Sequence, residues 1–590
     1  MMGTKTDSKH SRWWTVAGLG LLVIVGAYLR FSGLDQRTVT HIEMFVPGIH
    51  LPPEISGPGE RLTLAKTVTS TLSSDTHPIG YFVLMWAWTK CFGTSVTSIR
   101  IPSTLFAIAS IPLIFWLGVL VRKKTAAGVA AILLTFNAHH IFWSQAARMF
   151  TLECFLGLLA TVLLLLIARE ERASWPLGFL YVLVLLMGVA THVFFWAILG
   201  THMLWTFLNA WSQRQPLPGS ARLQIFALVL GSPLLAFAAY QSANPLAVLS
   251  SNILIYAREF VQFAFLFPLH GFSSGVFPNV AHVSLVDDPH LSIARWLFFL
   301  LSLILLGLGV ASIRKSEEKL FGDASGPSSK AWLFAAVLGT LAILAFILMA
   351  KAFVKPQPLP TLRGTEILIV LPFAFAGLAI ALQKTWVRFS DWLHPLLGSR
   401  FLTGEQALVL AIALIPFAAM AVMAPLKPMF NARGILFLTP YPLLILAWGI
   451  ARAGRNRFTA AFLLIVLSVA HYQGWKQYNQ MQVARADYKG FAAALAPHIE
   501  KSDLVFLPPG WTSTPIFYYF NPSWNWNRFI GLNYEAACRQ DPRARIWALV
   551  FYNYDDEYPK AMEEALSNYT AVQNIEAPGG RAVLYVPKSF

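Results

Sequence analysis

IPSTLFAIASIPLIFWLGVLVRKK, residues 101–124, is the stretch that decides the fold of this chain. Its first 21 residues carry no acidic or basic side chain, and their length matches the roughly 20 residues that a helix needs to cross a bilayer. Three basic residues, Arg122, Lys123 and Lys124, follow at once. Because Lys and Arg collect on the cytoplasmic side of membrane helices, the stretch predicts a spanning helix that ends in the cytoplasm.

The same pattern recurs along the chain and predicts an α-helical polytopic membrane protein with about thirteen spans. If the N-terminus is cytoplasmic, the inner connections hold 20 Lys or Arg in 78 residues, against 12 in 150 for the outer connections before residue 435. That asymmetry orients the bundle. The expected spans are 13–32, 101–121, 125–143, 150–168, 176–193, 194–211, 223–240, 293–313, 331–350, 365–383, 406–424, 435–451 and 457–473.

Composition excludes a soluble globular protein. The chain is 56% hydrophobic and 13% charged, with a mean hydropathy of +0.56, which leaves too little polar surface to cover a core of 590 residues. The net charge of +16 needs no nucleic-acid partner, since much of it lies in the cytoplasmic connections and meets anionic lipid. The first span follows a basic start and lacks a small-residue cleavage site, which favours a retained anchor helix over a signal peptide.

Two outer segments depart from a simple serpentine. The loop 33–100 becomes apolar and aromatic at 77–92, but counting that piece as a span would place the basic residues 122–124 outside. We therefore expect 77–92 to be a helix at the outer interface, with Trp86 and Trp88 as anchors. The apolar run 260–269 is too short to span, and we expect it to be re-entrant or to lie on the surface.

From residue 474 onward the composition becomes that of a soluble protein. We expect residues 474–590 to form a small α/β domain on the outer face, separate from a membrane domain that comprises residues 1–473. No glycine-rich phosphate loop, paired zinc ligands or nucleophile elbow occurs in it, which favours covering the bundle or binding an acceptor. The expected elements are helices at 487–499 and 558–569 and strands at 503–507, 545–552 and 581–586.

Glu43 is the acid nearest the end of the first span. A carboxylate at the membrane surface can take the proton of an acceptor hydroxyl as a general base, although a solvated loop residue is the alternative interpretation. Arg100 and Arg148 lie where spans meet the outer side, against the orientation rule, and Arg433 precedes a later span in the same way. Such cations suit a lipid phosphate, with contact to ordinary phospholipid headgroups as the alternative.

Other polar residues of the outer loops have less specific interpretations. Asp75 precedes a helix that begins near Pro78, so capping competes with a role in substrate binding. His139 and His140 are adjacent and face different directions on a helix, which favours hydrogen bonding at the interface over metal binding.

The chain resembles the GT-C superfamily of polyprenyl-phosphate-sugar-dependent glycosyltransferases. Within it, the likeness is to glycosyltransferase family 39, the bacterial relatives of protein O-mannosyltransferases, and to the aminoarabinose transferase that modifies lipid A. The likeness covers most of the chain in order. It is carried by Glu43, His77-Pro78-Ile79-Gly80-Tyr81, Arg100-Ile101-Pro102-Ser103, Ser144-Gln145, Ala147-Arg148-Met149, Arg433 before Pro440, and Asp487-Tyr488-Lys489-Gly490.

The resemblance implies a GT-C fold of thirteen spans with an outer catalytic cavity. It implies an inverting enzyme of the bacterial inner membrane, with a periplasmic C-terminal domain. That enzyme would move a sugar from a polyprenyl-phosphate carrier to a hydroxyl of a lipid, glycan or protein. In this interpretation Glu43 is the base, three arginines neutralise the lipid phosphate, and His77, Tyr81 and Asp75 contribute to the donor pocket. The three arginines are Arg100, Arg148 and Arg433.

Two departures from the family pattern bear on mechanism. The family usually has Asp where this chain has Ile42, and many relatives have Glu where this chain has Ala146. Either Glu43 takes over the work of the missing Asp, or the protein is a catalytically impaired relative that acts as a binding partner. A single Glu supplies too few oxygen ligands for a tightly held metal, so we predict no metal or other cofactor. A transporter or flippase for a lipid-linked sugar is the other alternative.

Overall fold

The fold is given by a computed structural model of the chain. The structure describes residues 5–49, 63–74, 77–121, 124–170, 174–212, 216–242, 301–302, 304–313, 404–423, 432–453, 457–485, 487–500, 502–506, 515–519, 529–530, 543–551, 564, 566–577 and 580–588. The chain divides into two compact units. Unit 1 comprises residues 1–32, 68–83 and 101–475, and unit 2 comprises residues 33–67, 84–100 and 476–590.

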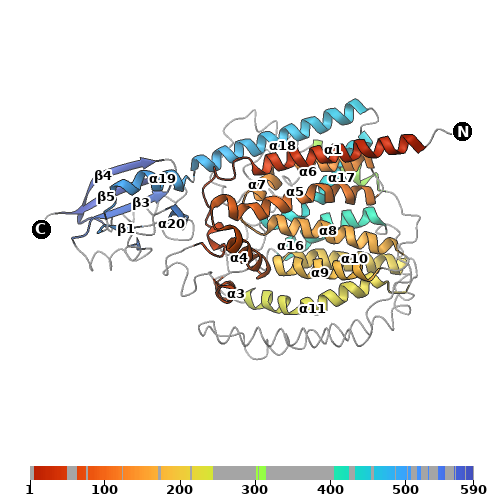
Figure 1. The fold of residues 1–590 in the computed structure, drawn as a ribbon, viewed down its shortest axis with the longest axis horizontal. Coiled ribbons are helices and arrows are strands. Elements are labelled where there is room, and N and C mark those ends of the chain that lie inside the picture. Colours follow the sequence, from red (N-terminus) through yellow and green to blue (C-terminus); the bar gives the residue numbers. More distant parts are fainter. Residues whose placement is uncertain are drawn as a thin grey trace. The chain divides into compact units, whose positions relative to one another are not determined.

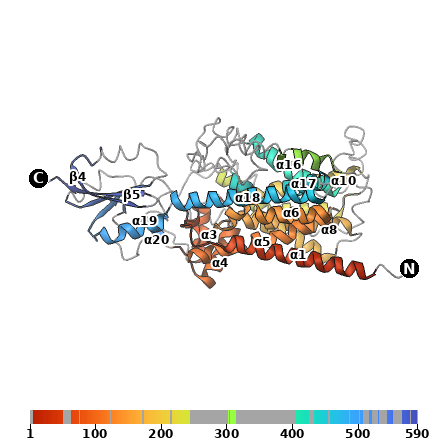
Figure 2. The same cartoon turned by 90° about the horizontal axis from the view of Figure 1, so that it is seen from above.

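Unit 1 is a helical bundle whose long helices run roughly parallel to one another (Figure 1, Figure 2). Helix α8 lies deep in this bundle, because 83% of its most apolar window is buried, against 17% for the corresponding window of α1. The exposed apolar side chains of α1, among them Leu21 and Ile24, suit contact with lipid. The helices that lie in unit 1 or begin or end there are α1 (Lys5–Phe31), α3 (Leu64–Ser74), α4 (Gly80–Phe92), α5 (Val96–Leu120), α6 (Lys124–Phe136), α7 (Ala138–Ser144), α8 (Phe150–Arg169), α9 (Trp175–Thr191), α10 (Phe195–Ser212), α11 (Gly219–Ser242), α16 (Glu405–Met423), α17 (Pro440–Ala453) and α18 (Arg457–Arg485).

Length and composition identify membrane spans among the described helices. Trp13–Phe31, Val96–Leu120 and Phe150–Arg169 are each long and apolar enough to cross a bilayer, and the bent pair α6 and α7 makes a fourth candidate. The protein is therefore a helical, multi-pass membrane protein. Helices also occupy the expected spans 176–193, 194–211, 223–240, 406–424, 435–451 and 457–473. The expected spans 331–350 and 365–383, residues 293–300 and 303 of the expected span 293–313, and the run 260–269 lie outside the described residues.

The expected span 125–143 is broken in the structure. Helices α6 and α7 meet at an angle of 54°, and Asn137 caps the second helix by accepting a hydrogen bond from the His140 backbone N–H at 2.9 Å. The break interrupts the hydrogen bonding at the end of α6, where the Asn137 N–H donates to Leu134 O at 3.3 Å, and the buried guanidinium of Arg30 donates to Leu134 O at 3.0 Å and to Thr135 O at 3.1 Å. Arg30, near the end of α1, thus satisfies the backbone carbonyls at the break between α6 and α7.

The histidines beside this break are buried in the bundle. His140 Nδ1 lies 2.9 Å from Arg30 Nη2, and since a guanidinium can only donate, the imidazole nitrogen accepts. His140 thus forms a hydrogen bond as expected, but it does so inside the bundle and not at the interface.

Unit 2 contains a five-stranded mixed sheet of order β2-β1-β3-β5-β4. The first three strands in that order are parallel to one another, whereas β5 runs antiparallel to both of its neighbours. Phe506, Ile546, Ala548 and Leu566 belong to its buried core. The strands are β1 (Leu504–Phe506), β2 (Phe529–Ile530), β3 (Ile546–Phe551), β4 (Tyr569–Ala577) and β5 (Gly580–Pro587).

Helix α19 (Tyr488–Leu495) packs on this sheet, and Asp487 caps it by accepting from the Gly490 N–H at 2.8 Å. Of the expected helix 558–569, residues 558–563 and 565 lie outside the described residues, and its last residue, Tyr569, begins strand β4 instead. A β-branched and aromatic stretch paired with β5 extends the sheet there.

The loop 33–100 contains the short 3₁₀ helix η1 (Glu43–Phe45) and the helices α3 and α4. Helix α4 occupies most of the segment expected as an interfacial helix. Within unit 2, Trp88 Nε1 donates to Ser98 O at 2.9 Å, and Thr89 Oγ1 donates to Pro47 O at 2.9 Å. These bonds tie the C-terminal end of α4 to the loop that carries Glu43.

Candidate functional site

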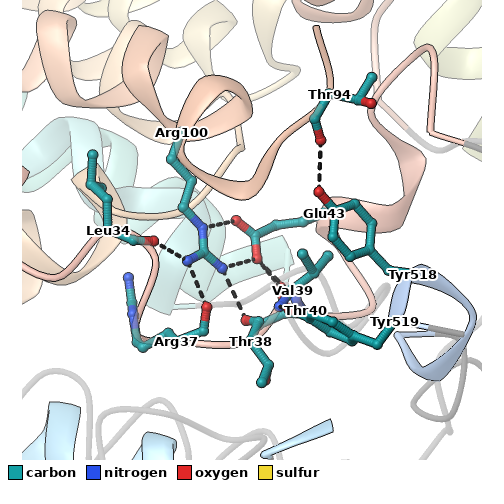
Figure 3. Close-up of polar contacts among 10 residues, drawn as sticks. All are labelled: Leu34, Arg37, Thr38, Val39, Thr40, Glu43, Thr94, Arg100, Tyr518 and Tyr519. Carbon is teal, nitrogen blue, oxygen red and sulfur yellow. Dashed lines mark hydrogen bonds and ion pairs between the residues drawn. The ribbon is translucent and has the colours of Figure 1, made fainter. Parts of the chain in front are cut away.

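Glu43 opens η1, and its side chain is fully buried. The Glu43 backbone N–H donates to Thr40 O at 2.9 Å, and the Glu43 carboxylate in turn accepts from the Thr40 N–H at 2.9 Å and from Thr40 Oγ1 at 3.1 Å. Glu43 therefore bonds to Thr40 both as a backbone donor and as a side-chain acceptor, which holds the turn together. The turn points the carboxylate inward, toward the first turn of α5 (Figure 3).

Arg100, in that first turn, meets the carboxylate with a bidentate ion pair. Its Nε donates to Oε1 and its Nη2 donates to Oε2, both at 2.8 Å. The remaining N–H groups donate to the backbone carbonyls of Leu34, Arg37 and Thr38 at 2.6 to 2.9 Å. All five N–H groups of the guanidinium are used, so Arg100 holds the whole turn from Leu34 to Glu43 (Figure 3).

Two tyrosines from α20 (Ile516–Tyr519) complete this cluster in unit 2. The buried Val39 N–H donates to Tyr519 Oη at 2.7 Å, and Tyr518 Oη donates to Thr94 O at 2.8 Å (Figure 3). Burial raises the pKa of both phenols above the usual value near 10, so both hydroxyls stay neutral. Residues far along the chain therefore stabilise the loop that carries Glu43.

The structure brings Glu43 and Arg100 together as partners of each other. With its five N–H groups used, Arg100 has none left for a phosphate in this arrangement. The Glu43 carboxylate accepts four hydrogen bonds, two from Thr40 and two from Arg100, so its oxygens are occupied in this arrangement. The roles predicted for the two residues therefore need the pair to open.

Arg148 has a different environment, in unit 1. It lies two residues before α8, is 5% exposed, and its backbone O accepts from Ser103 Oγ at 2.9 Å. Its Nε is buried and has no hydrogen-bond partner among the residues that the structure describes. A buried guanidinium group with an unused N–H is costly, and an anion would offset that cost.

Of the other four predicted site residues, the structure describes the side chains of two. His77 is half-buried, with its ring centroid 5.5 Å from that of His192, and Tyr81 is buried against Phe82. Arg433 lies in the 3₁₀ helix η7 (Ala432–Leu438), and its backbone is described but its side chain is not. Asp75 lies outside the described residues.

The predicted residues therefore fall into two groups. Glu43 and Arg100 form one ion pair in unit 2, and His77, Tyr81, Arg148 and Arg433 belong to unit 1.

Two residues of unit 1 that the sequence analysis did not select also form a polar pair. Glu153, in the first turn of α8, places Oε1 3.2 Å from Nδ1 of His192, at the end of α9. An acid inside an apolar run is a sequence signal for function, but its partner lies 39 residues away and cannot be read from spacing. Within the described ranges, no group of three His, Cys, Asp or Glu side chains is arranged to hold a metal.

Comparisons with known proteins give a likeness in structure alone. No family model matches the chain. No curated protein matches it either. The structure is similar to ArnT from Cupriavidus metallidurans bound to undecaprenyl phosphate, with 12% identity, a TM-score of 0.41, and 97% of this chain and 98% of that chain covered.

The structure is also similar to the oligosaccharyltransferase AglB from the archaeon Archaeoglobus fulgidus, in complex with an inhibitory peptide and a dolichol-phosphate. Identity is 12% and the TM-score 0.44, with 98% of this chain and 74% of that chain covered. A complex of the Archaeoglobus fulgidus oligosaccharyltransferase with Zn and sulfate gives 12% identity and a TM-score of 0.42 over 97% and 73% of the two chains.

Proposed function

We propose that this protein is a membrane glycosyltransferase. It takes a sugar from a polyprenyl-phosphate carrier at the outer leaflet and transfers it, with inversion, to a hydroxyl of a lipid, glycan or protein. The observation that carries the proposal is the buried guanidinium of Arg148, whose Nε has no partner among the described residues.

A phosphate of the carrier lipid satisfies that guanidinium. Charge-assisted hydrogen bonds from Arg to phosphate are among the stronger polar contacts in proteins, and a buried setting strengthens them further. During transfer the bond between the sugar and the phosphate breaks, and negative charge grows on the departing phosphate oxygen. A cation fixed beside that oxygen lowers the barrier, which is the role that we assign to Arg148. Arg433 belongs to the same unit, and we assign it the same role.

Glu43 and Arg100 enter the proposal as a pair that exchanges partners. A donor phosphate that takes over the Nε and Nη2 donors of Arg100 would release the Glu43 carboxylate. The same event would thus supply a phosphate ligand and free a base. In the arrangement of Figure 3 the pair is closed and holds the loop. We assign His77, Tyr81 and Asp75 to the walls of the donor pocket.

We further propose the topology that the sequence analysis predicts. It has thirteen spans in a bacterial inner membrane, a cytoplasmic N-terminus, and a small periplasmic α/β domain formed by residues 474–590. The mixed sheet and α19 supply that domain with its own buried core, which supports the proposal.

Transfer by purified protein tests the proposed activity. Full-length protein in proteoliposomes is given a labelled polyprenyl-phosphate sugar with an extract of envelope acceptors, and the release of free polyprenyl phosphate is measured. Arg148→Ala should lose donor binding and transfer together, and Arg148→Lys should recover part of both. Arg452→Ala is the matched control, because Arg452 is an exposed arginine in the last turn of α17. Transfer by Arg148→Ala at the rate of the wild type contradicts the proposal.

One observation favours a second candidate, a catalytically impaired relative that binds a lipid-linked sugar. Ile42, at the position where the family has Asp, is buried, and Glu43 beside it is paired with Arg100. The same assay separates the candidates, because a binder retains the donor without releasing polyprenyl phosphate. A transporter would move the intact lipid-linked sugar between leaflets.

A further inference from the structure

We propose that His192, oriented by Glu153, is the base that takes the proton of the acceptor hydroxyl, in place of Glu43, while the rest of the proposed function is unchanged. This inference rests on the proposed function and names a catalytic group that needs no opening of the Glu43–Arg100 pair. It starts from a buried carboxylate and a buried imidazole, neither of which the proposed function uses. Glu153 is 0% exposed and His192 is 3% exposed.

The local structure fixes the imidazole. His192 ends α9 in an extended conformation, with φ −151° and ψ 141°, and its backbone N–H donates to Gly188 O at 3.2 Å. The Glu153 Oε1 atom lies 3.2 Å from His192 Nδ1, and the Phe194 backbone N–H is placed to donate to the same nitrogen at 3.4 Å. Nδ1 can make only one of these two bonds at a time, and we assign the shorter one to the active form, in which Glu153 is ionised and Nδ1 carries the proton that it donates to the carboxylate.

That arrangement leaves Nε2 as the basic nitrogen of the ring. Among the described residues, no side chain or backbone group hydrogen-bonds to His192 Nε2. A carboxylate behind Nδ1 selects this tautomer and stabilises the imidazolium that forms when Nε2 takes a proton. Glu153 Oε2 is itself buried without a hydrogen-bond partner in the described part of the chain, so the Glu153 carboxyl group has the His192 ring as its polar contact there.

The surroundings of the ring are aromatic and partly open. The rings of His77, Phe150 and Phe194 lie 5.5, 5.9 and 5.0 Å from the His192 ring, measured between centroids. His77 and Phe194 are only partly buried, so His192 lies one side chain below the surface of unit 1. Glu153 from α8 and His77, which precedes α4, are the titratable groups that the described contacts place against the ring.

Backbone packing brings two predicted substrate-binding segments to this ring. A Cβ added at Gly434, next to Arg433, would lie 3.7 Å from His192 Cε1 and 2.8 Å from Phe194 Cε2, so η7 packs closely against both residues. A Cβ added at Gly80 would lie 2.6 Å from Ala190 O, so the start of α4 packs equally closely against the end of α9. The base therefore lies beside segments that the donor pocket is proposed to use.

The proton and electron balance of the step is complete without a further reactant. The acceptor O–H gives its proton to His192 Nε2, and the acceptor oxygen forms a bond to C1 of the sugar. The bond from C1 to the phosphate oxygen breaks, and its electron pair leaves with the polyprenyl phosphate. The imidazolium afterwards returns its proton to water. Glu153 is a positioning residue, because it acts on the ring and touches no substrate.

The experiment uses the full-length protein in proteoliposomes with labelled donor. His192→Ala should lower kcat by about 100-fold or more while donor binding and donor KM stay near those of the wild type, and added imidazole should restore part of the rate. Glu153→Gln still accepts from Nδ1 but has no charge, so the acidic limb of its pH–rate profile should move to lower pH. His498→Gln, an exposed histidine in unit 2, should leave all of these values unchanged. Size-exclusion elution and thermal unfolding monitor the folding of each variant.

The outcomes separate the two proposals. A wild-type rate in His192→Ala overturns the inference alone, and so does a folded variant with lowered kcat that imidazole does not rescue. An unmoved acidic limb in Glu153→Gln also overturns it, because a neutral Glu153 that donates to Nδ1 would leave the proton on Nε2. Wild-type protein that binds the donor but releases no polyprenyl phosphate overturns the proposed function and this inference together.

Discussion

Arg100 and Glu43, 57 residues apart in the chain, form a bidentate ion pair with two hydrogen bonds of 2.8 Å, and neither side chain is more than 1% exposed. The pair joins the first turn of α5 to the loop that follows the first span. Because three backbone carbonyls share the same guanidinium, the pair is the centre of a buried polar network rather than an isolated contact. Such networks are stable when complete and costly when one member is removed.

Glu43→Gln should therefore destabilise the folded protein by about 3–5 kcal/mol, since it leaves a buried guanidinium without its counter-charge. Thermal unfolding in detergent, followed by circular dichroism, measures the change. Glu576→Gln is the control, because Glu576 is exposed on β4 of the same unit and should shift stability by less than about 0.5 kcal/mol. A Glu43→Gln protein as stable as this control would show that the ion pair does not hold the loop.

Hydrogen exchange in the wild-type protein tests the proposed exchange of partners between Glu43, Arg100 and the donor phosphate. If donor phosphate opens the pair, wild-type protein should lose protection of the amides of Thr40 and Glu43 when donor binds, as measured by hydrogen exchange. Unchanged protection on donor binding would mean that the pair stays closed and that Glu43 does not serve as the base.

Tyr519→Phe should loosen the turn from the other side. The substitution leaves the buried Val39 N–H without its acceptor, at a cost of about 1–3 kcal/mol. Faster hydrogen exchange at Val39 would report it directly. Tyr518→Phe is the matched control, because it removes a donor to Thr94 O and leaves the Val39 bond in place. Equal exchange at Val39 in both variants would contradict the role given to Tyr519.

Alkaline pH should weaken unit 2 through the same residue. Burial raises the pKa of Tyr519, so the folded state holds the phenol proton more tightly than the unfolded state does. The resulting stability is fully present below the unfolded pKa near 10 and is lost as pH rises through the higher, folded pKa. Tyr519→Phe should therefore lose less stability than the wild type between neutral pH and pH values above about 10. A steeper alkaline loss in the variant would reverse the sign argued here.

The helices of unit 1 could be predicted largely because their signal is local. The apolar composition of residues 150–168 alone predicts a helix, and the observed helix α8 extends only one residue further at its C-terminal end. Strands β1 and β3 likewise followed from short apolar runs. The break in the expected span 125–143 did not, because an apolar stretch reads alike whether or not Asn137 caps a second helix within it.

The sites could be predicted only residue by residue. Glu43 and Arg100 could each be predicted separately, as a base and a phosphate ligand, because the position of each relative to the spans is visible in the sequence. Their pairing depends on how the loop folds back on α5, and the contact of Tyr519 with Val39 joins residues 480 apart. The His192–Glu153 pair was missed for the same reason, since the acid and the imidazole belong to two different helices.

Asn137→Ala should test the broken span. Loss of the side chain that accepts from the His140 N–H should cost about 1 kcal/mol, whereas Asn137→Asp keeps an acceptor and should cost less. The comparison of the two variants by thermal unfolding isolates the cap, because the two substitutions alter the same position. If both variants unfold at the wild-type temperature, residues 124–144 do not need the cap at this break.

Cysteine labelling in intact cells should test the proposed orientation, on which the outer location of Glu43 depends. Asp35 is exposed in the loop that carries Glu43, and Lys124 is exposed at the start of α6, on the predicted cytoplasmic side. In a background that lacks the exposed Cys91 and also Cys538, a membrane-impermeant maleimide should label Asp35→Cys from outside. Lys124→Cys should react only after the membrane is permeabilised, because basic residues near a span mark the cytoplasmic side. The reverse pattern would place Glu43 and Arg100 in the cytoplasm, away from a carrier lipid in the outer leaflet.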